Sequence, residues 1–384
     1  MVENDLLILG GGCAGLSLAR RLATLGNRCP RTHILERRSE YLADRTWCFW
    51  DEPKAALTEL IGHRWSVVSL AVGEREVRID CAETPYAMVP ATAFYQDSLA
   101  KIALAPKLKL ELGVAVHTPP QKLAGLWYVE TSAGTRSARN LVDTRPPTTF
   151  EPSSVLLWQS FIGHEIECME AVFEPGVAEI MHFAADGEGV ILFFYLLPSS
   201  SQRALLEVTV FARVPWQAAS FHEEMRAFLH RRVSDGRYTI LRSEHGILPM
   251  GQARTLPAVD GSYVTAGLFA GGARASSGYA FQRIQCWAND CAAALGAGLP
   301  PIPQRPDPLI LRGMDRIFLR VLRRYPELAP QLFLALFQKV DIAALVRFMS
   351  DQATLADYAA IVTALPTGLF LREIFSTFRS SFIP

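Results

Sequence analysis

The sequence predicts an α/β protein in which a Rossmann-type domain is interrupted by an inserted, mainly antiparallel β domain and followed by an all-helical C-terminal region. Three observations predict this fold class. A glycine-rich turn near the start of the chain joins an apolar strand to an apolar helix. The middle of the chain is a series of short strand-like segments. Beyond residue 300 the apolar residues recur with helical periodicity.

The Rossmann-type domain is expected over residues 1–150 and 245–300, with a hairpin insertion near 65–90. It opens as a strand–helix–strand unit, and after the β-rich middle the chain returns to it. Its expected strands and helices are Asp5–Leu9, Leu16–Ala23, Thr32–Glu36, Trp65–Leu70, Glu74–Asp80, Ala91–Ala103, Leu108–Val116, Leu126–Thr131, Tyr263–Ala266 and Tyr279–Ala294.

The β-rich domain is expected over residues 151–244 and would bind the substrate. Its expected strands are Val155–Ile162, Val172–Phe183, Val190–Leu197 and Ala204–Phe211, followed by a helix over Gln217–Arg232. The prolines of Leu299–Pro303 mark a linker to a helical region over residues 301–384.

One helix of the C-terminal region is amphipathic. Its apolar face is Met314, Ile317, Phe318, Val321, Leu322 and Tyr325. The other side carries Arg312, Arg316, Arg320 and Arg323. Two interpretations stay open: the helix lies at a membrane interface, or its apolar face packs on the domain.

Composition excludes several classes of protein. Half of the 384 residues are hydrophobic and a fifth are charged, which excludes disorder. Lys and Arg equal Asp and Glu at 38 each, so there is no basic field for nucleic acid. Seven scattered cysteines without a Cys-x-x-Cys pair, and eight histidines without a paired motif, predict neither disulfides nor a metal site. The longest clean apolar run, Val190–Leu197, is too short for the ~18 residues of a membrane span. No signal-peptide pattern precedes the first strand, so we expect a cytoplasmic protein.

Gly10, Gly12 and Gly15 form a Gly-x-Gly-x-x-Gly pattern between the first strand and the first helix. The first glycine permits a tight turn, the second lets the backbone approach a pyrophosphate, and the third lets helix and strand pack closely. Glu36 follows Gly12 by 24 residues, at the end of the second strand, where a carboxylate binds a ribose hydroxyl. The pattern predicts a dinucleotide site, with a ligand-free glycine turn as the alternative.

The first helical turn, which contains Cys13 and Ala14, would present its N–H groups to the pyrophosphate. A second glycine-rich turn, Gly267–Gly272, comes late in the chain. This arrangement resembles FAD-binding two-domain flavoproteins, in which the late turn and its helix hold the flavin ring. Those proteins often have Gly-Asp where this chain has Gly267-Leu268. The resemblance implies FAD as the cofactor, held in part by Gly267, Gly271, Gly278 and Tyr279. For Gly278 and Tyr279 a plain helix cap is the alternative.

Seven motifs follow one another along nearly the whole chain. They are Arg45–Trp50, Val142–Arg145, Trp158–Gly163, Phe194–Pro198, Leu205–Thr209, His245–Met250 and Ala275–Tyr279. In sequence and order they resemble the motifs of the FAD-dependent lycopene cyclases of bacterial β-cyclase type. The chain departs at two places: the usual Asp-Gly-Arg is Asp143-Thr144-Arg145, and a double acid is reduced to Glu207-Val208.

The resemblance implies a redox-neutral ring closure in carotenoid biosynthesis. A ψ end group of lycopene is protonated at its terminal double bond, the next alkene attacks the cation, and loss of a proton gives a β-ring. Glu207 matches the position that the family uses for acid–base work. Its apolar strand suits a proton donor, because burial raises the pKa of a carboxyl group. The alternative is a strand glutamate that points to solvent.

A carbocation is stabilised by the faces of aromatic rings, at about 0.5–2 kcal/mol each. The candidates are Trp47, Phe49, Trp50, Phe194 and Tyr195, and for each of them ordinary core packing is the alternative.

The resemblance also implies reduced FAD as a local negative charge and NAD(P)H as the electron donor. It assigns cofactor contacts to Arg45, Thr46, Asp143 and Arg145, although Arg145 could instead pair with Asp143. Because lycopene is too apolar to diffuse through water, we expect peripheral membrane contact. Two other functions stay open: a flavin monooxygenase or reductase acting on another isoprenoid, and a non-catalytic flavin-binding membrane protein.

Overall fold

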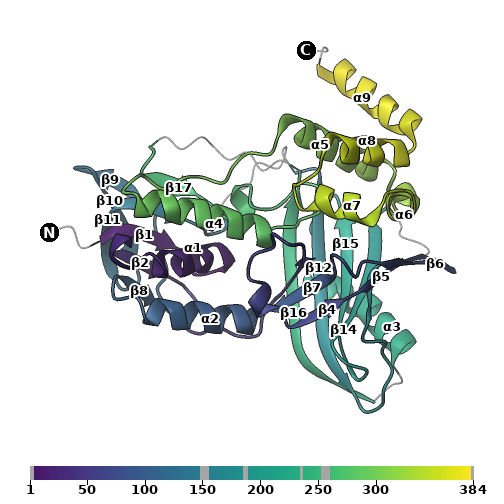
Figure 1. The fold of residues 1–384 in the computed structure, drawn as a ribbon, viewed down its shortest axis with the longest axis horizontal. Helices are drawn as coiled ribbons and strands as arrows, with labels where there is room; N and C mark the ends of the chain where they lie inside the picture. Colours follow the sequence, from purple (N-terminus) through teal and green to yellow (C-terminus); the bar gives the residue numbers. More distant parts are fainter. Residues whose placement is uncertain (1–3, 148–154, 185–188, 234–236, 252–259, 382–384) are drawn as a thin grey trace.

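The computed structural model describes residues 4–147, 155–184, 189–233, 237–251 and 260–381 (Figure 1). They form two seven-stranded sheets, a small third sheet and a helical C-terminal region. This confirms the predicted fold class: a sheet with a parallel core, a mainly antiparallel sheet, and a helical region that follows both.

The first sheet has the strand order β8-β2-β1-β11-β10-β9, and β17 pairs with β11. Its strands are β1 (Asn4–Leu9), β2 (Thr32–Leu35), β8 (Leu108–Glu111), β9 (Gln121–Leu123), β10 (Leu126–Thr131), β11 (Gly134–Asp143) and β17 (Tyr263–Thr265). Leu6 and Ile8 of β1 share a core with α1 (Cys13–Ala23), α2 (Ala91–Ala103) and α4 (Phe281–Gly296). Leu7 and Leu9 face the opposite core. Burial on both faces explains why β1 is an uninterrupted apolar run.

The second sheet has the order β16-β12-β15-β14-β13-β5-β6. Its strands are β5 (Val67–Val72), β6 (Arg75–Asp80), β12 (Leu157–Cys168), β13 (Val177–Phe183), β14 (Ile191–Pro198), β15 (Arg203–Ala212) and β16 (Tyr238–Met250). Helix α3 (His222–Arg232) covers one face, and the C-terminal helices cover the other. Each strand therefore divides its side chains between two cores.

Two details of this sheet differ from the expected organisation. The hairpin β5–β6, expected as an insertion of the Rossmann-type domain, pairs through β5 with β13 and extends the second sheet. Strand β16 runs across residues 244 and 245, where we expected a boundary. Pairing with β12 along its whole length keeps β16 extended.

A three-stranded sheet, β3-β7-β4, connects the two larger layers. Its strands are β3 (Thr46–Trp50), β4 (His63–Trp65) and β7 (Tyr86–Pro90). Alternation along β3 places Phe49 in the core of α1 and α4, and Trp50 in the core of the C-terminal helices. β3 therefore joins the two regions in which the sequence predicted cofactor and substrate.

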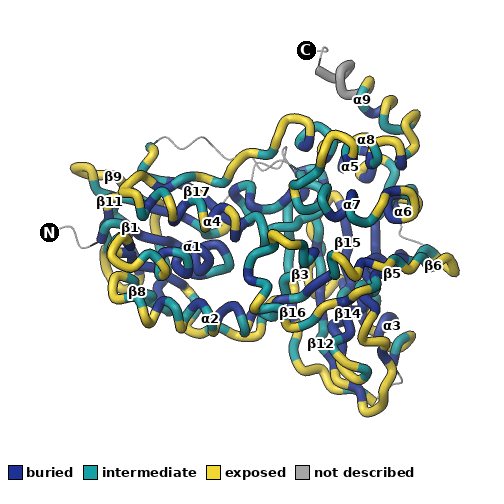
Figure 2. Tube along the Cα trace, in the orientation of Figure 1, coloured by how far each residue is buried: buried dark blue, intermediate teal, exposed yellow. Residues whose placement is uncertain are grey.

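The C-terminal region consists of α5 (Leu309–Arg324), α6 (Ala329–Lys339), α7 (Ile342–Met349), α8 (Leu355–Ala364) and α9 (Thr367–Ser381). Leu319 and Leu322 of α5 are fully buried against the second sheet, so the apolar face of α5 packs on the domain. Helix α9 instead projects from the body, and its described surface is largely exposed (Figures 1 and 2).

Candidate functional site

The turn between β1 and α1 has the geometry of a dinucleotide cradle. Gly10 adopts φ +96°, a conformation that favours glycine. A Cβ atom on Gly15 would lie 1.9 Å from the carbonyl oxygen of Gly10, so only glycine allows this contact. A Cβ atom on Gly12 would have no neighbour within 4 Å, which leaves open space at the start of α1. Gly10 thus makes the tight turn and Gly15 allows the close contact of helix and strand, while the approach of a pyrophosphate to Gly12 stays a prediction.

Glu36 closes one side of this turn. Its Oε2 accepts a hydrogen bond of 2.6 Å from the N–H of Gly11. Arg38 lies against Glu36, with Nε 3.1 Å from Oε1, and its guanidinium stands 4.7 Å from the ring centre of Tyr41. The Tyr41 hydroxyl donates to the carbonyl of Gly11 at 2.9 Å. Sequence reasoning missed Arg38 and Tyr41, because neither belongs to a spaced motif.

The late glycine turn lies beside the first helix. Gly267, with φ +93°, is so placed that an added Cβ atom would lie 3.0 Å from Cβ of Ala14. Burial raises the pKa of Cys13 to about 12, so its thiol stays neutral and does not compete with an anion at the N-terminus of α1. The open space before Gly12, the unblocked helix start and Glu36 together fit a bound dinucleotide.

Asp143 and Arg145 lie at the end of β11, next to the cradle. Arg145 donates from Nη2 to Asp143 at 2.7 Å, and Tyr263 donates to the same carboxylate at 3.3 Å. Of the two alternatives for Arg145, the pairing with Asp143 is therefore present. An added Cβ atom on Gly10 would lie 3.3 Å from Cγ of Arg145, so the pair still borders the cradle.

Arg45 and Thr46, both expected at the cofactor, have different surroundings. Burial raises the pKa of both Cys13 and Glu244, and the Arg45 charge opposes both rises, so Arg45 lies within electrostatic reach of the cradle and of the second sheet. Thr46 donates to Glu244 Oε2 at 2.8 Å and accepts a 2.7 Å hydrogen bond from Arg242. The structure thus brings Thr46 to a carboxylate of the second sheet.

Glu207 lies in a row of four residues that crosses the second sheet. Tyr195 of β14 pairs with Glu207 of β15, which pairs with Gly163 of β12, which pairs with Glu244 of β16. Directly paired residues point to the same face of a sheet. All four therefore face the side of the sheet that the C-terminal helices cover.

The surroundings of Glu207 favour its protonated form. Loss of solvation raises the pKa of the Glu207 carboxyl to about 8, and the charge of Glu244 adds to the rise. A hydrogen bond from Thr209 to Oε1, 2.7 Å long, acts in the opposite direction. Because Thr209 occupies Oε1, the acid proton belongs on Oε2. Glu207 is a half-buried side chain that is an acid at neutral pH.

Tyrosines surround this acid. Burial raises the pKa of Tyr279 to about 12 and that of Tyr195 well above its ordinary value, and Tyr279 adds to the rise at Tyr195. Tyr86 joins them, with its ring 5.1 Å from Trp50. These phenols stay neutral and present aromatic faces. Tyr86 carried no motif, and pairing of β7 with β3 is what brings it here.

The other predicted aromatic residues lie elsewhere. Trp47 and Phe49 stack on Phe281 at 5.2 and 5.5 Å, within the core of α1 and α4. Phe194 packs against Phe228 of α3, at 4.6 Å, on the opposite face of the second sheet from Glu207. Only Trp50 and Tyr195 of the five are therefore on the Glu207 side.

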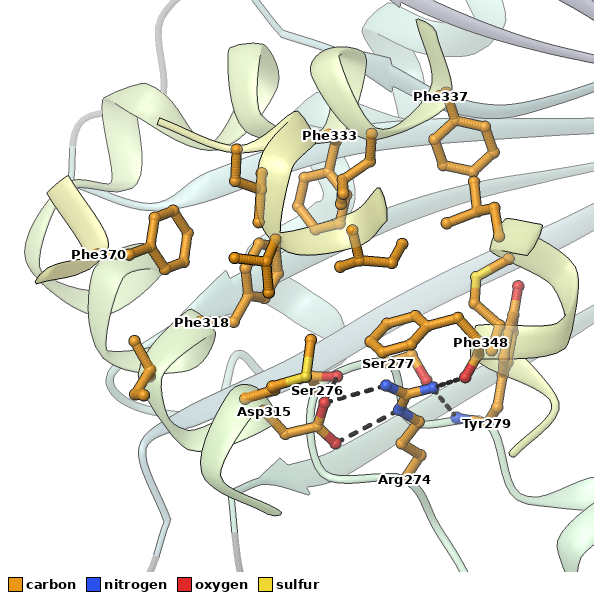
Figure 3. A pocket seen from close by; sticks show the side chains of 18 of the residues that line it. Arg274, Ser276, Ser277, Tyr279, Asp315, Phe318, Phe333, Phe337, Phe348 and Phe370 are labelled. Atoms are coloured by element: carbon orange, nitrogen blue, oxygen red, sulfur yellow. Dashed lines mark hydrogen bonds and ion pairs between the residues drawn. The ribbon is translucent and has the colours of Figure 1, made fainter. Parts of the chain in front are cut away.

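A cavity of about 400 Å³ lies between the second sheet and the C-terminal helices (Figure 3). Most of its wall is apolar, and its aromatic lining residues are Tyr195, Phe211, Tyr279, Phe318, Phe333, Phe337, Phe348 and Phe370. Glu207 is not a lining residue, but its strand neighbour Tyr195 is. The acid therefore lies one strand away from a residue of the cavity wall.

Polar groups gather on one side of the cavity, away from Phe370 (Figure 3). Arg274 and Asp315 form a buried ion pair of 3.2 Å, and Ser276 donates to Asp315 at 2.8 Å. The Arg274 guanidinium also stands 4.1 Å from the ring centre of Phe348. The charges compensate each other, so this side of the cavity is polar without a net charge.

Gly278 and Tyr279, expected at the flavin, lie just before α4. Gly278 has φ +72°, and a Cβ atom there would approach Gln159 Oε1 at 2.8 Å. Gln159 lines the cavity, and within the described residues its Oε1 has no hydrogen-bond partner. Gly271, with φ +88°, turns the chain in the late glycine turn. These residues connect the cradle to the cavity.

Solved structures with this fold are flavoenzymes. A geranylgeranyl bacteriochlorophyll reductase-like protein from Thermoplasma acidophilum superposes with a TM-score of 0.60 at 12% identity, over 94% of this chain and 95% of that one. The flavin-dependent brominase Bmp2 gives 0.60 at 12% identity over 98% and 99%. The anhydrotetracycline hydroxylase OxyS from Streptomyces rimosus gives 0.59 at 17% over 91% and 76%. At these identities the likeness shows the fold alone.

The family model described as "Lycopene cyclase protein" matches residues 5–373. The chain therefore belongs to the lycopene cyclase family, as its motifs predicted. A search of curated proteins finds no match.

Proposed function

We propose that this protein is a flavin-dependent lycopene β-cyclase. The observation that carries the proposal is the neutral Glu207 acid beside Tyr195, at the wall of an apolar cavity, in a member of this family. Ring closure needs a proton donor and a surface that does not trap a cation. Both are found on one face of the second sheet.

Glu207 would donate its Oε2 proton to the terminal double bond of a ψ end group. The ring faces of Tyr195 and Tyr279 would stabilise the resulting cation. Because the pKa values of both phenols are raised, they would stay protonated and offer the cation no phenolate nucleophile. The next alkene closes the ring, and the ring then loses a proton, so the reaction is redox-neutral and returns the acid. The apolar cavity excludes the water that would otherwise capture the cation.

The Gly10–Gly15 cradle and Glu36 fit FAD, and the late glycine turn, with Gly278 and Tyr279, leads from there to the cavity. When bound in its reduced form, FAD would supply negative charge beside the cation without a net change in redox state. We propose NAD(P)H as its reductant.

We further propose that the protein takes its substrate from a membrane at α8 and α9. Val362, Leu371 and Ile374 line the cavity, and the exposed fractions of Leu371 and Phe375 are 51% and 68%. Within the described residues no single helix is long and apolar enough to cross a bilayer; α8 and α9, bent by 98°, reach that length and composition only as a pair. Exposed apolar side chains beside a cavity mouth suit a peripheral contact.

Expression in cells that accumulate lycopene, followed by pigment analysis, tests the proposal. We expect products with β-rings and the mass of lycopene, formed with catalytic amounts of reductant. Unchanged lycopene beside folded, FAD-loaded protein would contradict the proposal. Products heavier by oxygen or hydrogen, with stoichiometric NAD(P)H consumption, would assign the protein to the hydroxylases or reductases that share its fold.

A further inference from the structure

Glu244 is a second buried carboxylate on the same face as Glu207, and its sequence position carried no catalytic expectation. Only 5% of its surface is exposed. Thr46 and Arg242 both donate to its Oε2, and within the described residues Oε1 receives no hydrogen bond. Burial raises the pKa of the Glu244 carboxyl above its ordinary value, while the Arg242 charge and the hydrogen bonds from Arg242 and Thr46 oppose the rise and favour the ionised form.

Arg242 is shared between two carboxylates. Its Nε donates to Glu165 of β12 while its Nη1 donates to Glu244. Glu165 also pairs with Arg203 of β15, 2.5 Å away, so the two carboxylates and two guanidiniums balance in charge. Glu244 is the carboxylate among them whose charge raises the pKa of Glu207.

Gly163 separates the two glutamates. It stands between Glu207 and Glu244 in the row, and an added Cβ atom would lie 3.0 Å from Cγ of Glu244 and 3.2 Å from Cδ1 of Leu205. Two strand spacings place the glutamate backbones roughly 10 Å apart. Because position 163 has no side chain, no group stands between the two carboxyls in this row.

We propose that Glu244 is a positioning residue for Glu207: anchored by Arg242 and Thr46, it faces Glu207 across Gly163 and keeps that residue in its acid form between turnovers. The inference rests on the proposed function, since it gives Glu207 the role of proton donor. Titratable and charged groups from other elements also face this pair. They are Cys48 of β3, Tyr86 of β7, Tyr195 of β14, Tyr279, Arg45, and Glu165 through Arg242.

The sign of the effect follows from charge. Removing the negative charge of Glu244 makes ionisation of Glu207 easier, so the Glu207 acid is lost at a lower pH. A unit charge roughly 8–10 Å away at an effective dielectric constant of ~20 corresponds to about one pH unit.

The test is Glu244→Gln, with Glu165→Gln as the matched control: it also loses an Arg242 contact, but the Glu165 charge is not among the causes that raise the pKa of Glu207. Infrared spectroscopy of protein with ¹³C-labelled glutamate follows the protonated carboxyl band, and Glu207→Gln identifies the Glu207 contribution. Cyclisation is measured over the same pH range. We expect the midpoint of both curves to fall by about one pH unit in Glu244→Gln and to stay in place in Glu165→Gln.

An unchanged or raised midpoint in Glu244→Gln would overturn the inference, as would an equal fall in Glu165→Gln. If Glu244→Gln does not fold, Glu244→Asp and Gly163→Ala provide the measurement. We expect Glu244→Asp to keep the wild-type midpoint within the resolution of the titration, whereas Gly163→Ala displaces Glu244 and lowers the midpoint; the reverse order would overturn the inference. If the infrared midpoint falls in Glu244→Gln but the wild-type protein forms no β-rings, the proposed function is refuted and the coupling of the two carboxyls still stands.

Discussion

The two faces of the second sheet are built from the same strands and differ in what they bury. Under α3, Leu206, Val208 and Phe194 form a dry core with Phe228. Under the C-terminal helices, the intervening positions carry Glu207, Tyr195 and the wall of the cavity. The comparison teaches that alternation along β14 and β15 separates a face that packs as core from the face that carries the proposed acid.

The strongest test of this comparison substitutes one residue on each face of the sheet. We expect Glu207→Gln to lower cyclisation by at least ~100-fold, the usual range for loss of a general acid, with FAD binding and thermal unfolding close to wild type. Its neighbour Leu206 is fully buried, and Leu206→Ala should cost about 2–5 kcal/mol of unfolding free energy. Pigment analysis and calorimetry of both variants give the answer. Full activity in Glu207→Gln would show that Glu207 is not the proton donor.

The pH dependence gives the second test. The pKa of Glu207 is raised to about 8, so the acid form dominates below that pH and is lost above it. Cyclisation should therefore fall as pH rises through about 8, whereas an ordinary carboxyl would already be ionised at neutral pH. The measurement is the initial rate in detergent or liposomes between pH 6 and pH 10, with FAD absorbance as a control for cofactor loss. A rate that falls only at acidic pH would mean that Glu207 acts as a base.

How much of this was visible in the sequence depends on the range of the interactions. The Gly10–Gly15 cradle and Glu36 are local in sequence, so spacing alone was enough to predict that they lie together; their binding of a dinucleotide stays a prediction. The sequence assigned both Phe194 and Tyr195 to the cation site because they are neighbours in one motif. Neighbouring residues of a strand point to opposite faces of the sheet, so Phe194 lies in the core under α3 while Tyr195 lies beside Glu207. Glu244 was missed because its partner Thr46 is 198 residues away. Strand β3 was missed because it pairs with β7 in a small sheet, a non-local contact that propensity does not reveal.

Tyr195 and Phe194, adjacent on β14, allow the two faces to be compared within one strand. Tyr195→Leu removes an aromatic face next to Glu207, and we expect cyclisation to fall by about 2- to 30-fold, equivalent to ~0.5–2 kcal/mol. Phe194→Leu changes the core under α3, and we expect the activity per folded molecule to stay near wild type while thermal stability falls. Activities normalised to bound FAD separate the two effects. A larger loss of activity in Phe194→Leu than in Tyr195→Leu would show that the face under α3 contributes to the chemistry.

The smallest expected effect concerns how the substrate reaches the cavity. Leu371 and Phe375 are exposed on α9, and Leu371 also lines the cavity, so the double variant Leu371→Ser with Phe375→Ser should weaken sedimentation with anionic liposomes several-fold. The control is Leu104→Ser, at a leucine just after α2 in the Rossmann-type domain that is more exposed, at 85%, than either residue of α9; this variant should leave sedimentation unchanged. The same double variant should keep its activity toward lycopene presented in detergent, because Glu207 and Tyr195 are untouched. Equal sedimentation of the double variant and wild type would move the membrane contact away from α9. Equal loss with Leu104→Ser would indicate that the liposomes bind exposed apolar side chains without regard to their place in the fold.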